Sequence, residues 1–195
     1  LATSRDQFSG FEKLGIKVAL ETEEAIKRAT VVIDCTPSGA GLANKEKYYL
    51  KAAQGGGKGY IAQGSEFGFG KMYARGINDE VLKPGEDKFV QVVSCNTHNL
   101  SALIKLFGTQ NNTAPENLGG ADFVCMRRAN DISQDDDFVA SPEVGKHKDE
   151  QFGTHHARDA YYLYKTKGWE LKGLYSSALK LNTQFMHVVR FHIKV

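Results

Sequence analysis

The first half of the chain alternates short apolar runs with stretches of helical pattern, and this alternation is the feature that most constrains its fold. The apolar runs lie at residues 30–33, 60–62 and 89–93, and the helical patterns at 22–28 and 44–51. Continuous apolar runs of this length are typical of strands buried in a parallel sheet, where helices join successive strands. Thr22 and Glu23 give the first helix a capping hydroxyl and an acidic first turn. We therefore expect an α/β layer in this half.

The last third of the chain has a different pattern. Residues 122–128, 169–180 and 184–195 alternate as strands do, and residues 130–150 form a long polar loop. Strands without intervening helices predict an antiparallel sheet. The expected fold class is thus α/β plus α+β, with one domain over residues 1–91 and a second over 92–195.

Composition excludes several functional classes. The formal net charge of +2 lacks the basic excess of a nucleic-acid-binding protein. The sequence has no run of about 18 apolar residues and no charged-then-apolar leader, so we expect neither a membrane span nor export. Cys35, Cys95 and Cys125 lie far apart in no metal-like spacing, which favours free thiols in the reducing cytoplasm.

Cys95 is the sharpest candidate for chemistry. It lies between the strand at 89–93 and a helical repeat at Leu100, Leu103, Ile104 and Phe107. A thiol at a helix N-terminus faces the positive end of the dipole and unpaired backbone N–H groups. Both favour the nucleophilic thiolate, and the same amides could hold an oxyanion. The alternative is a buried cysteine that acts as a small hydrophobic residue.

Histidines and arginines supply candidate partners for this thiol. His187 lies in a strand pattern, and His155 and His156 follow the long loop; any of them could act as a base, although a structural role is the alternative. No companion ligands accompany the adjacent pair, so we expect no metal. The guanidiniums of Arg127 and Arg128 suit phosphate binding, or they are simply solvated. The glycine run at 55–59 predicts a turn, with a phosphate loop as the alternative.

At these residues the sequence resembles the archaeal (type II) glyceraldehyde-3-phosphate dehydrogenases. The stretch Asp-Cys-Thr-Pro-Ser-Gly at 34–39, followed by Asn-Lys-Glu at 44–46, is similar to one family segment, and Gln-Gly-Ser-Glu at 63–66 to another. Val-Val-Ser-Cys-Asn-Thr at 92–97 matches the catalytic-cysteine motif, and Met-Arg-Arg-Ala at 126–129 the strand with an arginine pair. Thr-His-His at 154–156 is similar to a Ser-His-His loop, and Phe-Met-His at 185–187 to the strand that bears the catalytic histidine.

The resemblance implies a partial Rossmann-like NAD(P)-binding domain over 1–91 and an antiparallel-sheet catalytic domain over 92–195. It implies phosphorylating oxidation of glyceraldehyde 3-phosphate to 1,3-bisphosphoglycerate with NAD or NADP and inorganic phosphate. Cys95 would form the thiohemiacetal and thioester, and His187 would be the base. The substrate-binding residues would be Ser94, Asn96, Thr97, His155, His156 and Arg127. The cofactor-binding residues would be Thr36, Pro37, Gln63, Gly64, Ser65 and Arg128.

The chain departs from the family pattern in sequence and in extent. His98 and Asn99 stand where the family has Thr-Gly, and Val189 stands where its histidine strand has a second histidine. The family's first strand and glycine-rich turn would precede Leu1, and a long segment would follow Val195. We therefore expect a chain truncated at both ends that binds NAD(P) weakly or not at all. Two alternatives are a related semialdehyde dehydrogenase and a non-catalytic remnant that acts as an assembly module.

The segment 169–195 also bears on assembly. Its alternation predicts a sheet with one face on its own core and the other face free. Met186 and Val188 fall on the face expected to meet solvent, where a contiguous patch of apolar side chains is unusual. In the family that the chain resembles, this face meets a neighbouring subunit, which implies a homo-oligomer, a dimer or tetramer.

Overall fold

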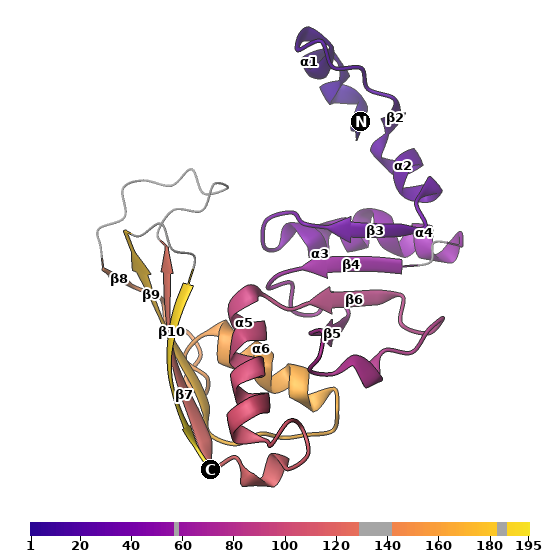
Figure 1. Cartoon of the computed structure of the whole chain (residues 1–195). Coiled ribbons are helices and arrows are strands. Elements are labelled where there is room, and N and C mark those ends of the chain that lie inside the picture. The colour runs from indigo at the N-terminus through magenta and orange to yellow at the C-terminus, as the bar shows by residue number, and fades with distance from the viewer. Residues whose placement is uncertain (57–58, 129–141, 183–186) are drawn as a thin grey trace. The chain divides into compact units, whose positions relative to one another are not determined.

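A computed structural model of the chain describes residues 1–56, 59–128, 142–182 and 187–195 (Figure 1). It divides into two compact units, one formed by residues 1–71 and 83–92 and the other by 72–82 and 93–195. The segment 72–82, which the predicted boundary at residue 92 would place in the first domain, packs within the second unit. Among the described residues, no helix is long and apolar enough to cross a membrane.

The first unit is built on parallel strands, as the apolar runs predict. They are β3 (Val31–Asp34), β4 (Gly59–Gln63) and β6 (Phe89–Val92), with β4 between the other two. The helical stretch that follows β3 comprises α3 (Ala40–Asn44), the π-helical turn η2 (Lys45–Tyr49) and α4 (Leu50–Gln54). This stretch is the crossover that a parallel pair requires. The strand, helix and turn predictions for this part of the sequence are confirmed, except that Gly57 and Lys58 of the predicted turn lie outside the described residues.

An aromatic stack forms the core of the first unit. Tyr60 lies between Tyr49 and Phe89, at ring-centroid distances of 5.2 Å and 5.0 Å. Phe69 is fully buried against Tyr49 and Phe89. The helices cover only one face of β3 and β4 (Figure 1). The prediction that β3 is fully buried is therefore wrong for its other face, where Val31 and Ile33 are 49% and 64% exposed.

Short elements precede β3. The strands β1 (Ala2–Thr3) and β2 (Leu20–Glu21) pair in parallel, and between them lie η1 (Arg5–Gln7) and α1 (Phe8–Lys13). The helix α2 (Thr22–Arg28) begins and ends where predicted. The predicted cap is wrong, because Thr22 is the first helical residue and the N-cap is Glu21, whose side chain makes no capping hydrogen bond. Further along, β5 (Lys71–Tyr73) spans the point where the chain passes into the second unit, and η3 (Asp79–Val81) follows it.

The second unit contains a four-stranded sheet in the order β10-β7-β9-β8. Its strands are β7 (Gly120–Arg128), β8 (Glu143–Val144), β9 (Leu174–Leu181) and β10 (His187–Lys194). The pairs β10–β7 and β8–β9 are antiparallel as predicted, but β7 and β9 are parallel. The sheet is mixed because a helix, α6 (His155–Lys165), lies in the connection from β7 to β9, and the sequence prediction omitted it.

Two helices lie against one face of this sheet, and no helix of the described residues lies against the other face (Figure 1). The predicted helix after β6 is present as α5 (Cys95–Leu103) and the π-helical turn η4 (Ile104–Gly108). Leu100 and Ile104 are fully buried, and the core continues through Phe123 and Leu163. Phe107, at the end of the predicted apolar face, is instead 56% exposed and stacks on Phe191 at 5.7 Å. The turn η5 (Pro115–Asn117) interrupts the predicted loop before β7.

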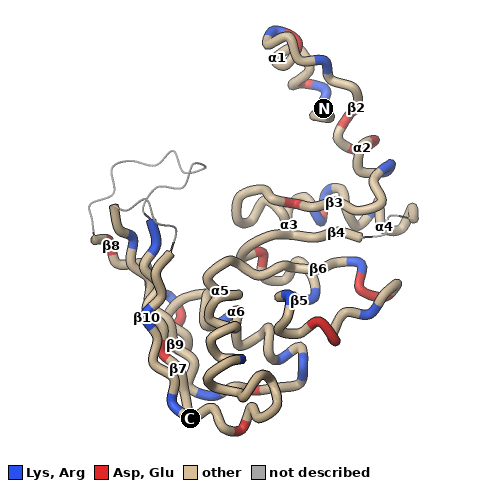
Figure 2. The backbone as a smooth tube through the Cα atoms, viewed as in Figure 1, with Lys and Arg blue, Asp and Glu red and all other residues tan. Residues whose placement is uncertain are grey.

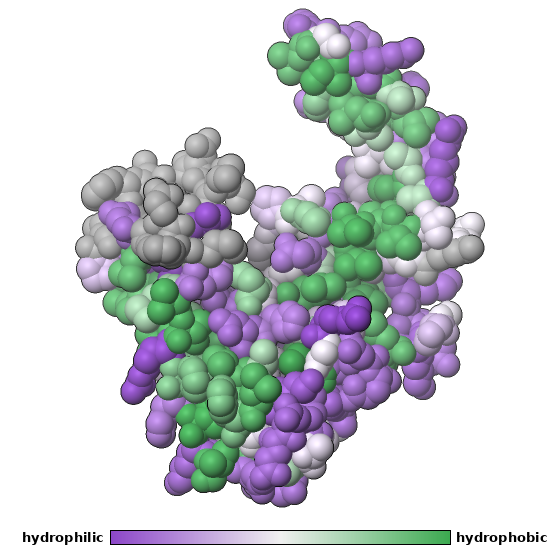
Figure 3. Space-filling view, viewed as in Figure 1, coloured by the Kyte–Doolittle hydropathy of each residue, from purple (hydrophilic) through white to green (hydrophobic). Residues whose placement is uncertain are grey.

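The surface of the described residues mixes both signs of charge and several apolar groups. Figure 2 shows Lys and Arg interspersed with Asp and Glu along the chain. Hydrophobic side chains gather over β10 and α5 on the face that Figure 3 shows. Val188 is 54% exposed, as predicted, whereas Met186 and most of the predicted loop at 130–150 lie outside the described residues.

Candidate active site

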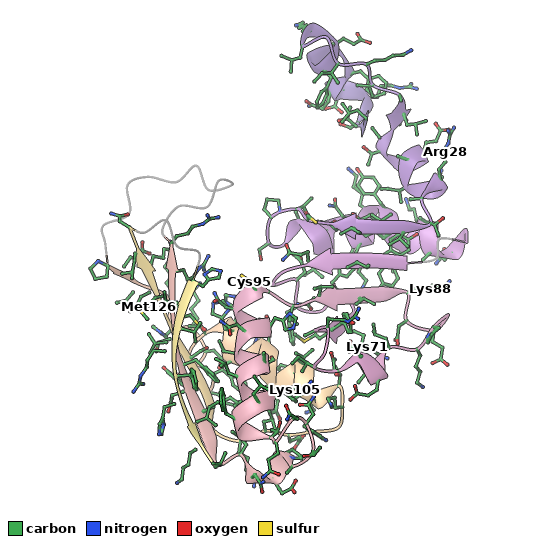
Figure 4. The ribbon with its side chains drawn as sticks, viewed as in Figure 1. Arg28, Lys71, Lys88, Cys95, Lys105 and Met126 are labelled. Atoms are coloured by element: carbon green, nitrogen blue, oxygen red, sulfur yellow. The ribbon has the colours of Figure 1, made fainter. Side chains whose placement is uncertain are left out.

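Cys95 is the first residue of α5 and is exposed, as its position between a strand and a helix predicts (Figure 4). Ser94 is the N-cap: its Oγ accepts from the backbone N–H of Thr97 and lies 2.9 Å from Thr97 Oγ1. A capping hydroxyl fixes the first turn, whose leading N–H groups have no acceptor within the helix. The thiol therefore lies beside the positive end of a nine-residue helix.

His187 is the residue that faces this thiol. It opens β10, and its Nε2 lies 3.0 Å from Cys95 Sγ although the two residues are 92 positions apart in the sequence. In the β10–β7 register His187 lies opposite Arg127. Directly opposed residues project from the same face of a sheet, so Arg127 also lies on the face that α5 and α6 cover. The sulfur and the imidazole are close enough for a proton to pass between them.

His155 and His156, the histidine pair, open α6. Thr154 caps that helix, and Ser176 of β9 accepts from the backbone N–H of Ala157 at 3.0 Å. Before the cap, Gly153 has a φ of +71°, and a Cβ there would lie 2.4 Å from the carbonyl oxygen of Ser176. Only glycine fits this close approach, which delivers the pair to the site. The two rings lie 3.9 Å apart, centroid to centroid.

The histidine pair is neutral at physiological pH. Burial, together with the charges of Arg158 and Arg127, lowers the pKa of His155 to about 4. Burial lowers the pKa of His156 to about 2, with added effects of His155, Arg127 and His187. His156 is 3% exposed, and neither of its ring nitrogens has a partner among the described residues. These imidazoles can therefore act as hydrogen-bonding groups rather than as fixed cations.

The predicted arginine pair is split between two faces. Neighbouring residues of a strand point to opposite sides, so Arg128 projects from β7 away from Arg127. The Nε of Arg127 is buried without a partner among the described residues, and its charge acts on the histidine pair. Cys125, two residues earlier on the same face, is fully buried, and burial raises the pKa of its thiol to about 11. It is therefore an inert thiol.

The remaining predicted substrate residues lie in the first turn of α5. Asn96 is 2% exposed and Thr97 is fully buried, with its hydroxyl bonded to Ser94 as described above. Their predicted contact with substrate stays a prediction. His98 lies in the same turn, and its Nε2 is 3.0 Å from the carbonyl oxygen of Arg75, so its ring is held by the segment 72–82.

The predicted cofactor residues of the first unit gather at one edge of its sheet. Thr36 and Pro37 follow β3, and Gln63, Gly64 and Ser65 end or follow β4, at the carboxyl ends of parallel strands. This edge is where open α/β sheets bind ligands. Thr36, Pro37 and Gln63 are exposed there, and the Thr36 hydroxyl donates to Asp34; their contact with a cofactor stays a prediction.

Two buried carboxylates fix this edge. Asp34 accepts from Thr36, from Asn44 Nδ2 at 3.0 Å and from Tyr49 OH at 2.6 Å. Burial opposes ionisation, but these hydrogen bonds lower the pKa of Asp34 below its usual value. Glu66, 3% exposed, accepts from the backbone N–H groups of Gly39 and Leu42 and so occupies the start of α3.

Sequence reasoning missed Asp159, which lies on α6 one turn after the histidine pair. Its side chain is fully buried, and its Oδ1 accepts from Arg158 Nε at 3.0 Å and Nη2 at 2.9 Å. Burial raises the pKa of Asp159, while Arg158 opposes the shift. The capping Thr154 and the buried spacing Ala157, Ala160, Leu163 and Tyr164 could have revealed this helix. In the described part of the chain, no three His, Cys, Asp or Glu residues gather as metal ligands would.

Comparison with known proteins finds related sequences over about half of the chain. The chain is 42% identical over 115 residues to the glyceraldehyde-3-phosphate dehydrogenase of Methanococcoides burtonii, a match over 55% of this chain and 32% of that protein. It is 39% identical over 107 residues to glyceraldehyde-3-phosphate dehydrogenase 2 of Methanosarcina acetivorans, over 51% of this chain and 30% of that protein. The protein of the same name from Archaeoglobus fulgidus is 36% identical over 104 residues, with coverages of 51% and 28%.

These matches cover about a third of the length of the curated relatives. No protein-family model matches the sequence. The matches confirm the resemblance drawn from the motifs. The chain is a homologue of the archaeal glyceraldehyde-3-phosphate dehydrogenases over about half of its own length.

Proposed function

We propose that this chain carries the thiol chemistry of a phosphorylating glyceraldehyde-3-phosphate dehydrogenase, which forms 1,3-bisphosphoglycerate with NAD or NADP. The observation that carries the proposal is the 3.0 Å approach of His187 Nε2 to Cys95 Sγ at the start of α5. A nucleophile, a base within hydrogen-bond reach and a helix N-terminus form the arrangement that acyl-transfer chemistry requires. The relatives reported above are named glyceraldehyde-3-phosphate dehydrogenases.

In the proposed reaction His187 accepts the Cys95 proton as the sulfur adds to the aldehyde carbon. The imidazolium then protonates the oxygen of the thiohemiacetal and takes that proton back as the carbonyl re-forms. When bound, a nicotinamide dinucleotide would supply the acceptor for the hydride that leaves this carbon. A phosphate oxygen then attacks the thioester carbonyl, the carbon–sulfur bond breaks, and Cys95 leaves as thiolate. The amides of the first turn of α5 stabilise the oxygen whenever it carries negative charge.

Arg127 and the histidine pair would hold the substrate. Arg127 supplies the positive charge that a phosphate needs, because the histidine pair is neutral. The neutral imidazoles would then orient the substrate, each through one hydrogen-bond donor or acceptor. Arg128, from the opposite face of β7, stays a proposed cofactor or phosphate residue. Thr36, Pro37, Gln63, Gly64 and Ser65 would hold the dinucleotide at the carboxyl edge of the first sheet.

We further propose that the free face of the second sheet mediates self-association in a homo-oligomer. One apolar row crosses all four strands there: Val188 pairs with Met126, Met126 with Leu179, and Leu179 with Val144. Figure 4 shows Met126 on the side of the sheet away from α5. Val144 is 63% exposed and Val188 54%, and a row of this kind favours a two-fold contact between identical sheets.

All three cysteines are free, which suits a reducing compartment such as the cytoplasm.

The proposal is tested by nucleotide reduction in the presence of glyceraldehyde 3-phosphate and inorganic phosphate, followed by absorbance for NAD and NADP separately. We expect Cys95→Ser to abolish turnover and Cys35→Ser to leave it unchanged, because Cys35 is an exposed thiol to which the proposed chemistry assigns no role. Aspartate semialdehyde, the substrate of a rival enzyme class, should not be turned over. Full turnover by Cys95→Ser would overturn the proposed role of the thiol.

A further inference from the structure

Asp159 is a buried acid that the chemistry above does not use. Its side chain has no solvent exposure, yet only Oδ1 has partners, since Oδ2 has none among the described residues. A buried carboxylate with an unmet oxygen is costly, and buried polar atoms are nearly always paired with protein or ordered water. The two hydrogen bonds that Arg158 donates to Oδ1 favour the ionised form. Oδ2 is therefore an acceptor that needs a donor inside the protein.

His156 is a neighbouring side chain whose ring nitrogens also lack hydrogen-bond partners among the described residues. It lies three residues before Asp159 on α6, and residues three apart lie side by side on a helix. His156 is 3% exposed, and both its Nδ1 and its Nε2 lack partners among the described residues. A neutral imidazole has one N–H donor and one acceptor nitrogen. One unmet acceptor and one unmet donor thus lie a single helical turn apart.

We propose that Asp159 is a positioning residue that takes the N–H of His156 through one bridging water and so fixes the tautomer of that ring. A buried water joining two polar groups is a common structural element, and second-layer carboxylates orient functional imidazoles in this way. The other nitrogen of His156 then carries the lone pair of the neutral ring.

The fixed tautomer has a consequence for specificity, which rests on the proposed function. An imidazole that presents a lone pair accepts a hydrogen bond and cannot donate one. Phosphate oxygens at neutral pH chiefly accept, so His156 cannot serve as their donor. A hydroxyl group can donate to it. The geometry therefore assigns His156 to a hydroxyl of the substrate, and the phosphate charge to Arg127.

Ring-nitrogen NMR of the ¹⁵N-labelled 195-residue chain tests the tautomer without any turnover. We expect the two nitrogens of His156 in the wild type at pH 7 to have the separate shifts of one fixed neutral tautomer. Asp159→Leu should bring them toward a common average, because the acceptor is removed. The matched control is Asp122→Leu, an exposed acid on the other face of β7, which should change nothing. If Asp159→Leu does not fold, the isosteric Asp159→Asn supplies the comparison.

Averaged shifts in the wild type would overturn the proposal, and so would an unchanged His156 in a folded Asp159 variant. A kinetic arm tests the specificity. Asp159→Asn should raise KM for glyceraldehyde 3-phosphate about tenfold, the loss of one hydrogen bond, and leave KM for the 2-deoxy analogue unchanged. An equal rise for both substrates would refute the hydroxyl assignment. Absence of turnover in the wild type would count against the proposed function alone, because the NMR result stands without it.

Discussion

Replacing His187 with alanine tests the central contact of the site through the reactivity of Cys95. The two groups are 3.0 Å apart, and a hydrogen bond to a charged group contributes about 1.5–3 kcal/mol. Its loss removes a factor of roughly 10 to 100 from the activation of the sulfur, since each 1.4 kcal/mol is tenfold. A thiolate without its partner is a stronger nucleophile, which recovers a little under half of that factor on a logarithmic scale. We therefore expect Cys95 in His187→Ala to alkylate roughly 4- to 15-fold more slowly.

The assay is limited iodoacetamide labelling at pH 7, with peptide mass spectrometry for all three cysteines. The other two thiols are internal references. Cys35 is exposed but does not lie at the N-terminus of a helix, and Cys125 is buried, which raises the pKa of its thiol. We expect the order Cys95, Cys35, Cys125 in the wild type. His192→Ala, an exposed histidine of the same strand, should leave the order unchanged. Equal Cys95 rates in His187→Ala and the wild type would refute the reasoning.

Three further predictions concern stability and assembly. Between pH 6.5 and about 4 the histidine pair binds protons only in the unfolded chain. As the pH is lowered through this range, the free energy of unfolding should decrease by up to about 1.4 kcal/mol per pH unit for each ring. Asp159, whose pKa is raised, opposes part of this slope, and urea unfolding at pH 7 and pH 5 measures the net effect. Gly153→Ala should lower the unfolding midpoint more than Gly168→Ala does. Both glycines have positive φ, but only at Gly153 would the added Cβ lie close to a carbonyl oxygen, that of Ser176, at 2.4 Å. Light scattering after size exclusion should find a defined oligomer that Val188→Asp weakens, and a monodisperse wild-type monomer would contradict the proposed assembly.

The strands and most helices could be predicted because their signals are local. Each buried strand is an apolar run, and α2 carries its own start and stop residues. The helix α6 escaped prediction because its buried face includes His156 and Asp159, so the face does not stand out as apolar. Its omission also made the second sheet look wholly antiparallel. The buried polar residues that are proposed to act in the site thus hid the helix that carries them.

Cys95 could be singled out because a strand end and a helix start adjoin it in the sequence. Its pairing with His187 could only be inferred from the family resemblance, since it depends on the register of β10 against β7. A one-residue slip would turn His187 to the opposite face. The same alternation decides between Arg127 and Arg128, which sequence alone could not separate. Burial, which sets the charge of the histidine pair, is likewise a property of the folded chain.

The proposed catalytic residues and the proposed cofactor residues lie in different compact units. Cys95, His187, Arg127, the histidine pair and Asp159 all belong to the second unit, whereas the proposed cofactor edge beyond β3 and β4 belongs to the first. In the proposed reaction, nucleophile activation and thioester release would use only groups of the second unit, and hydride acceptance would need the dinucleotide. A substitution at Gln63 should therefore affect nucleotide reduction while the alkylation rate of Cys95 stays constant. The thiol chemistry can thus be measured separately from the redox step, because the fold holds the two sets of residues in separate cores.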